Sequence, residues 1–256
     1  MFSITDDGPI RWLTIENPTR RNAIPPGEWA TLADHLQDFG TSEQRSLVIT
    51  GSGEDFCSGA DLAAGFSLQG GPTMAYEAMR PLSRAARTLY QLDKPTVAAV
   101  DGVAVGAGMN LALGCDIVIA SSRARFSEIF VRRGLMVDFG GLWLLPRRIG
   151  LARAKELALT GRVIGAEEAL RYGVAAEVVA PEDLHRRAGE VAAELAAAAP
   201  LAQHPVKMGL DHSFEMSFDE ALEYEVQAQA QCLVSEDVIE GITAFLQKRP
   251  PEFKGR

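Results

Sequence analysis

The fold of this chain is decided by the stretch Val100-Asp101-Gly102-Val103-Ala104-Val105-Gly106-Ala107-Gly108-Met109-Asn110. An apolar strand at residues 96–100 precedes its glycines, and a helical segment at residues 109–114 follows them. A second small-residue turn, Phe56-Cys57-Ser58-Gly59-Ala60-Asp61-Leu62, comes shortly after a buried strand at residues 47–50. Strands that alternate with helices in this way predict an α/β protein with a largely parallel core.

The rest of the chain extends this pattern in both directions. Alternating segments around Asp6-Asp7-Gly8-Pro9 predict an N-terminal hairpin. Apolar runs predict further strands at 117–120 and 125–127, and helices at 27–39, 74–91, 142–149, 152–160, 166–172 and 181–199. Two or three more helices are expected beyond Pro200 and Pro205. We therefore expect an α/β core over residues 1–195 and a helical region over residues 196–256.

Composition and charge exclude several classes of function. The formal net charge of −9 argues against nonspecific binding to nucleic acid or to an anionic membrane. Three scattered cysteines and an N-terminus without a signal-peptide pattern favour a cytoplasmic protein. The sequence has no Walker loop, no complete dinucleotide-binding loop and no histidine spacing typical of a metal site. We therefore expect neither a bound metal nor a permanently bound cofactor.

The two small-residue turns are the best candidates for chemistry. A turn that enters a helix directs free N–H groups outward, and small residues let a ligand approach the main chain closely. If the two strands are neighbours, the amides of Ala60 and Ala107 could converge on one oxygen and form an oxyanion hole. The alternative is that both turns serve only tight packing.

These turns belong to a series of motifs that resembles the enoyl-CoA hydratase/isomerase (crotonase) family. The resemblance covers essentially the whole chain, in order. Its segments are Asn17-Pro18 through Asn22-Ala23, Phe56 to Leu62, Val100 to Gly108, Cys115-Asp116-Ile117-Val118-Ile119-Ala120, Leu144 to Gly150, Leu159-Thr160-Gly161 and Phe245 to Arg249.

The resemblance implies a fold, an assembly and a substrate class. The fold is a crotonase-like spiral of ββα repeats, with a C-terminal helical region that forms trimers or dimers of trimers. The substrates are coenzyme A thioesters, as in fatty acid metabolism, with coenzyme A entering as part of the substrate. Carried over by position, Ala60 and Ala107 supply the oxyanion amides, and Gly106 lies beside them. The remaining positions would contact the coenzyme or a neighbouring subunit's ligand: Arg21, Ala23, Ser58, Gly59, Asp61, Leu62, Phe245 and Lys248.

The sequence departs from the family's hydratases at two positions. Hydratases use two glutamates to add water, and those positions hold Asn110 and Phe130 here. Neither side chain has a basic site. The pattern around Asp138 instead resembles family members that shift double bonds, dienoyl-CoA isomerases and the ring-epoxide isomerase of phenylacetate degradation, in which an aspartate moves the proton. The subtype implied is an isomerase without the two hydratase glutamates.

The apolar neighbours of Asp138 would raise its pKa and its basicity, which suits a proton shuttle. The alternative role for Asp138 is an N-cap on the helix near Gly140. Glu128 is a second candidate acid, and a solvated strand-end charge is its expected alternative. Asn110 could orient a water or simply be a buried polar residue. An enoyl-CoA hydratase, a hydrolase that uses Asp138 as nucleophile and a coenzyme A thioester-binding protein with decayed catalysis all remain open.

Overall fold

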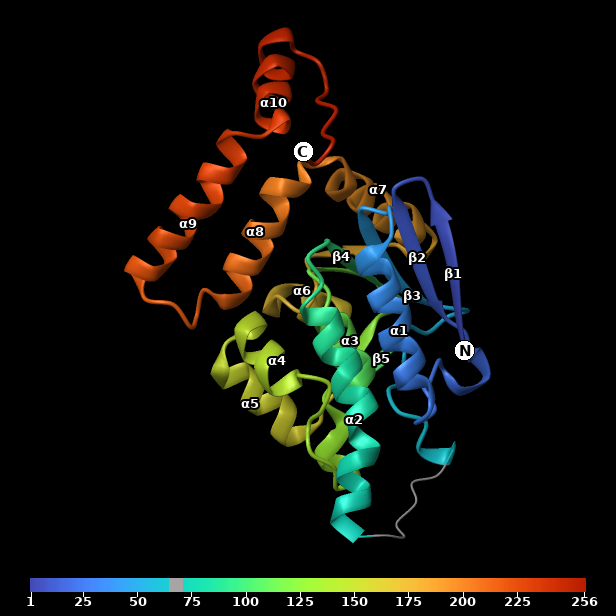
Figure 1. Ribbon diagram of the computed structural model, residues 1–256. Helices are drawn as coiled ribbons and strands as arrows, with labels where there is room; N and C mark the ends of the chain where they lie inside the picture. The colour runs from blue at the N-terminus through green and yellow to red at the C-terminus, as the bar shows by residue number, and fades with distance from the viewer. Residues whose placement is uncertain (65–70) are drawn as a thin grey trace.

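Parallel strands form the centre of the fold in a computed structural model that describes residues 1–64 and 71–256 (Figure 1). A six-stranded sheet has the order β1-β2-β3-β4-β6-β9, and only the β1–β2 pair is antiparallel. A three-stranded sheet has the order β5-β7-β8. The strands of the larger sheet are β1 Phe2–Asp7, β2 Ile10–Ile15, β3 Ser46–Gly51, β4 Thr96–Val100, β6 Ile117–Ser121 and β9 Glu177–Val179. Those of the smaller sheet are β5 Val103–Val105, β7 Arg125–Ser127 and β8 Ile164–Gly165.

The chain visits the two sheets in turn and then forms a helix, which makes a ββα repeat. Strand β4 lies in the large sheet, β5 in the small one, and α3 (Ala107–Leu113) follows. Strands β6 and β7 repeat this order before the 3-10 helix η3 (Ile129–Arg133). After β3, Cys57 makes a parallel bridge to Ala104 of β5. The chain therefore winds as a spiral, and the predicted α/β class is confirmed.

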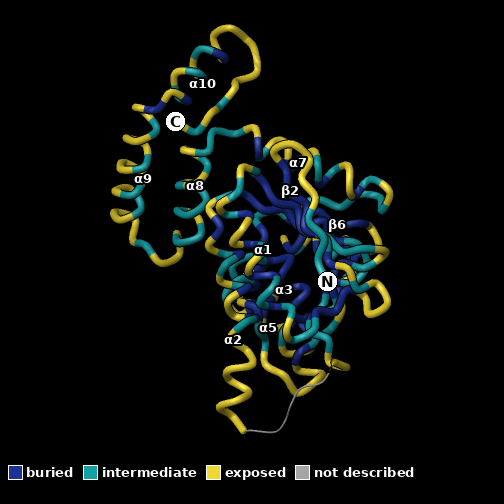
Figure 2. Tube along the Cα trace, turned by 45° about the vertical axis from the view of Figure 1, so that its right-hand side comes forward, coloured by how far each residue is buried: buried dark blue, intermediate teal, exposed yellow. Residues whose placement is uncertain are grey.

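The two faces of the large sheet are covered by different helices because side chains alternate along each strand. On one face, Trp12, Val48 and Val97 pack with Ala188 of α7 (Leu184–Ala197). On the other face, Leu13 and its neighbours pack with α1 (Glu28–Thr41), α2 (Gly71–Tyr90) and α3. Helix α1 buries Trp29, Leu32, Ala33, Leu36 and Phe39, which have the spacing of one helix face. Figure 2 shows this buried centre in dark blue.

Three helices continue away from this core. They are α8 (Pro200–His212), α9 (Phe218–Leu233) and α10 (Glu236–Gln247), and most of their positions are partly or fully exposed (Figures 1 and 2). Helix α9 begins with a capping box between Ser217 and Glu220. Across the described residues, no helix combines the length and the apolar character needed to cross a membrane.

Most predicted elements are present within a few residues of their expected bounds. The N-terminal hairpin and the predicted helices are confirmed, the later ones being α4 Gly141–Ile149, α5 Leu151–Thr160 and α6 Ala166–Tyr172. The sequence analysis missed β5, β8 and β9. These strands have only two or three residues, which is too short to show a clear alternation, although the equally short β7 was predicted. The division at residue 195 stays a prediction.

Candidate active site

The two small-residue turns lie side by side. Strands β3 and β4 are parallel neighbours, with Leu47 opposite Thr96, so the segments that follow them leave the sheet together. The N–H of Cys57 donates to the carbonyl of Val103 at 2.8 Å, and the N–H of Val105 donates to the carbonyl of Cys57 at 3.0 Å. The condition set by the sequence analysis, that the two strands be neighbours, is therefore met.

The amides of Ala60 and Ala107 are free to face a ligand. The N–H of Ile24 donates to the carbonyl of Gly59 and the N–H of Asp61 donates to the carbonyl of Ile24, at 2.8 and 2.9 Å. The intervening N–H of Ala60 therefore points away from Ile24, because alternate groups on a strand face opposite sides. Ala107 opens α3, where N–H groups have no partner within the helix. Within the described chain, no hydrogen bond uses either amide as donor.

Glycine is required where the turns touch. Gly59 has φ +88°, and a Cβ there would lie 2.8 Å from the carbonyl oxygen of Val105 and 3.3 Å from the nitrogen of Ala107. A Cβ on Gly108 would overlap the carbonyl of Cys57. These contacts show how closely the Gly59–Ala60 main chain approaches the start of α3. The arrangement can hold negative charge on an oxygen that both amides reach.

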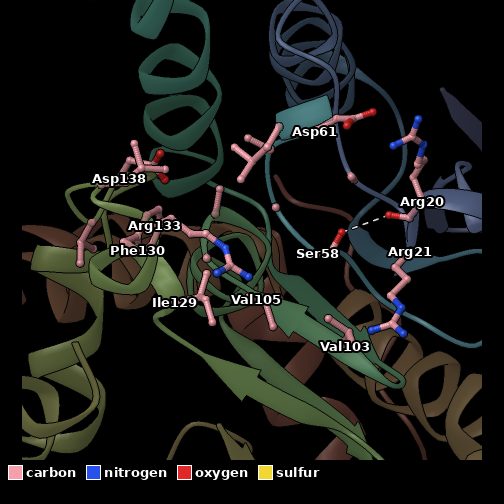
Figure 3. Close-up of a pocket in the computed structure, with 18 of the residues that line it drawn as sticks. Arg20, Arg21, Ser58, Asp61, Val103, Val105, Ile129, Phe130, Arg133 and Asp138 are labelled. Carbon is pink, nitrogen blue, oxygen red and sulfur yellow. Dashed lines mark hydrogen bonds between the residues drawn. The ribbon is translucent and has the colours of Figure 1, made fainter. Parts of the chain in front are cut away.

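The turns form one wall of a cavity of about 880 Å³ (Figure 3). Asp138 lies on one side of the cavity, while Arg20 and Arg21 lie on the opposite side with Asp61 and Ser58 (Figure 3). The Ser58 hydroxyl donates to the carbonyl of Arg20 at 3.1 Å. Between the two sides the lining is mainly apolar: Val103, Val105, Ile129, Phe130, Leu135, Met136 and Val137.

Asp138 presents a desolvated carboxyl group to this cavity. Burial raises its pKa to about 7, and its Oδ1 atom has no hydrogen-bond partner within residues 1–64 and 71–256. The N-cap of α4 is Gly140, and no side chain caps that helix. The capping alternative for Asp138 is therefore wrong, because its side chain faces the cavity rather than the N–H groups of α4. A carboxyl group that titrates near neutral pH can both accept and return a proton.

Asn110 and Glu128 lie behind the wall rather than on it. Both side chains are fully buried, at 0% exposure, and neither contacts the cavity. The Asn110 amide nitrogen donates to Glu128 Oε2 at 3.3 Å and to the carbonyl oxygen of Asp138 at 2.9 Å. The expectation that Glu128 is a solvated strand-end charge is wrong, because α3 and the Asp138 segment cover the end of β7. Burial and the nearby Asp138 raise the pKa of Glu128 to about 8.

The structure gathers most of the predicted site residues around this one cavity. Those that line it are Arg21, Ala23, Ser58, Gly59, Ala60, Asp61, Leu62, Gly106, Ala107, Phe130 and Asp138. Phe245 and Lys248 are not among them, since they lie at the end of α10, where Phe245 is 81% exposed. Their predicted contact with a neighbouring subunit's ligand stays a prediction.

Three arginines that line the cavity were missed as site residues. Arg20 is next to Arg21 in the chain, whereas Arg125 and Arg133 come from other segments, and Arg133 lies on the same side of the cavity as Phe130 and Asp138 (Figure 3). The sequence offered the pairs Arg20-Arg21, Arg132-Arg133 and Arg147-Arg148 as candidate basic patches for a phosphate, of which Arg147-Arg148 does not line this cavity, and nothing indicated that Arg125 would do so. Guanidinium groups bind phosphate well, so the end of the cavity that holds Arg20 and Arg21 suits an anionic ligand. Among the described residues, no cluster of His, Cys, Asp and Glu could hold a metal ion.

Comparison with known proteins identifies the family to which this chain belongs. The family model for enoyl-CoA hydratase/isomerase matches residues 6–256. A "Probable enoyl-CoA hydratase" of Rhodobacter capsulatus is 40% identical over 95% of this chain and 94% of its own length. The "1,2-epoxyphenylacetyl-CoA isomerase" of Escherichia coli K12 is 38% identical over 96% and 95%. The solved enoyl-CoA hydratase of Bacillus anthracis superposes with a TM-score of 0.94 at 30% identity, covering 100% and 99% of the two chains. The chain therefore belongs to the enoyl-CoA hydratase/isomerase family, and its spiral α/β fold is the crotonase fold.

Proposed function

We propose that this protein isomerises an unsaturated acyl-coenzyme A, with Asp138 moving the proton. The observation that carries the proposal is the half-buried Asp138 carboxyl group on the cavity wall, whose Oδ1 atom has no partner among the described residues. Burial raises the pKa of this carboxyl group to about 7. Asn110 and Phe130, which the family resemblance aligns with the two hydratase glutamates, offer no general base. The name of the epoxide isomerase relative also favours isomerisation.

In this reaction the Asp138 carboxylate removes a proton from a saturated carbon of the acyl chain. The carbanion that results is conjugated with the thioester. The electron pair moves into the thioester carbonyl and gives an enolate, whose oxygen accepts hydrogen bonds from the amides of Ala60 and Ala107. Each such donor contributes about 3 kcal/mol to the stability of the charged species. Asp138 then returns the proton to another carbon, so the double bond moves while the atoms and charge of the substrate are unchanged.

The arginine side of the cavity supports coenzyme A as the carrier. Coenzyme A bears phosphates, and Arg20 and Arg21 line the cavity on the side opposite Asp138, which leaves room for an extended chain between them (Figure 3). The apolar lining near Asp138 suits a hydrocarbon acyl group.

The test compares wild type with Asp138→Asn on 2-enoyl, 3-enoyl and 3,5-dienoyl-CoA thioesters. We expect the wild type to isomerise at least one of them, and the near-isosteric amide to lower kcat about a thousandfold. The wild-type rate should rise with pH through about 7, because only the ionised carboxylate accepts a proton.

Three results would contradict the proposal. Hydrated product that survives Asp138→Asn would favour a hydratase, as the name of the Rhodobacter relative suggests. A covalent ester on Asp138, detected by mass spectrometry, would indicate a hydrolase with a nucleophilic aspartate. Thioester binding without any turnover would indicate a binding protein.

We further propose that α8–α10 pack on neighbouring subunits in a trimer or a dimer of trimers. Large apolar side chains on this region are exposed in the single chain, which supports such contacts: Phe214, Phe218, Val226, Val234, Ile239 and Phe245. Sedimentation analysis should give a trimer or hexamer, and a stable monomer would contradict the proposal.

A further inference from the structure

A second carboxyl group lies behind Asp138 and takes no direct part in the proposed reaction. Glu128 stands between β7 and η3 without any exposed surface. The Asn110 amide connects it to the Asp138 segment, because the same nitrogen donates to Glu128 Oε2 and to the carbonyl of Asp138. Asn110 is itself held tightly, since a Cβ on Gly141 of α4 would overlap its amide.

This cluster has more acceptors than donors. The Asn110 nitrogen carries two hydrogens, and its two bonds use both of them. In the described part of the chain, Asn110 Oδ1, Glu128 Oε1 and Asp138 Oδ1 are buried without a partner. A proton on Glu128 would supply a missing donor, whereas an ionised Glu128 would leave its charge buried and poorly solvated.

No cation among the described residues compensates Glu128. On its own side, Arg132 donates to the carbonyl of Thr160, and Arg133 lines the cavity. Asn110 of α3, which faces the Glu128 carboxyl group, is neutral. The backbone of Gly161, next to α5, packs against the carbonyl oxygen of Glu128. The charged group that acts on the carboxyl is Asp138, whose negative charge adds to the effect of burial and raises the pKa of Glu128.

We propose that Glu128 is a positioning residue that must carry a proton during turnover. Protonated, it completes the hydrogen bonds around Asn110 and so fixes the segment that carries Asp138. Ionised, it places a second negative charge behind the Asp138 carboxylate and opposes the enolate that forms in front of it. This inference rests on the proposed isomerisation and predicts a second, alkaline limit to the reaction.

The test measures kcat and KM against pH for wild type, Glu128→Gln and Glu128→Ala. The wild-type kcat should rise through about pH 7 and fall through about pH 8, following Asp138 and Glu128. Glu128→Gln, whose amide stays neutral and donates, should keep the acidic limb and lose the alkaline one. Glu128→Ala should lower kcat about tenfold with KM unchanged, because Glu128 does not line the cavity. Glu167→Gln, an exposed residue on α6, is the matched control.

Two outcomes on activity would overturn the inference. An unchanged alkaline limb in Glu128→Gln would mean that the charge of Glu128 does not reach the reaction. Loss of activity at every pH, as expected for Asp138→Asn, would make Glu128 a proton-transfer group instead.

An infrared measurement separates this inference from the proposed function. The difference between the wild-type and Glu128→Gln spectra, in which the contribution of Asp138 cancels, should contain the carbonyl band of a protonated carboxylic acid at pH 7, and this band should lose half its intensity near pH 8. It requires no turnover, so it tests the proton on Glu128 even if the isomerase assay fails. Absence of the band at pH 7 would overturn the inference.

Discussion

The two walls of the cavity are built from different chemical groups. Main-chain amides form one wall, and side chains form the other. The backbone wall consists of the main chain at Ala60 and Ala107, whose N–H groups we propose as an oxyanion hole, fixed by glycines that touch neighbouring main chain. The acid wall consists of side chains, with Asp138 in front and Asn110 and Glu128 behind it. The glycines of the first wall leave no room for a Cβ, whereas the second retains buried oxygens without partners among the described residues.

This difference indicates which wall determines the type of reaction. The backbone wall can stabilise any thioester enolate, because its amides contact only the enolate oxygen. They do not determine which atoms give and receive the proton. Relatives named as a hydratase and as an isomerase are 40% and 38% identical to this chain, so overall similarity does not separate the two reactions. The position and protonation of the acids can separate them.

Replacing a glycine in the backbone wall is expected to have the largest effect on stability. In Gly108→Ala, the new methyl group would overlap the carbonyl of Cys57, and neither main-chain segment can move without disturbing β5 and α3. We expect a loss of about 3 kcal/mol in the free energy of unfolding, measured by urea denaturation. Gly27→Ala, where the added Cβ meets no atom, is the control and should change it by less than about 1 kcal/mol. Equal effects at both sites would show that the backbone wall is not tightly packed.

Neutralising the acid wall should instead stabilise the protein. The pKa of Glu128 is raised from the usual 4.5 to about 8, so the folded state binds this proton more tightly than the unfolded chain. The contribution of this proton to the free energy of unfolding is complete below pH 4.5 and is lost as the pH rises toward 8.

Glu128→Gln removes this dependence. The variant should gain stability relative to wild type as the pH rises. Its advantage in the free energy of unfolding should be larger at pH 8 than at pH 4 by about 4 kcal/mol. Urea denaturation at both pH values measures the difference, with Glu167→Gln as control. A variant that parallels wild type across this range would mean that Glu128 ionises normally.

The smallest effect is expected at the arginine side, remote from both reacting groups. The Arg21 side chain is 69% exposed, and it lines the cavity opposite Asp138 (Figure 3). Arg21→Ala should raise KM about fivefold and leave kcat unchanged, because a phosphate contact binds ground state and transition state alike. Arg84→Ala on α2, whose side chain pairs with Asp34 instead, is the control. A fall in kcat for Arg21→Ala would show that this side also aligns the reacting carbon atoms.

The regular elements were predictable because their side chains repeat. The apolar spacing of α1 and the run of β4 identify these elements without any tertiary information. Strands β5, β8 and β9 were not predicted, because such short segments depend on a partner beside them, and of the short strands only β7 was expected from the sequence. The contact of Arg125 with the cavity could not be predicted either, because it forms only once β7 has paired with β5.

The sequence by itself determined the α/β repeat, the two glycine turns and the presence of Asp138 among apolar neighbours. These features depend on nearby residues, so they can be interpreted from local pattern. Only the tertiary structure decided that Glu128 is buried, that Asp138 does not cap α4 and that the Asn110 amide bridges the two acids. The physical reason is that desolvation and hydrogen bonding depend on segments far apart in the chain, and α3, β7 and the start of α4 meet only after folding.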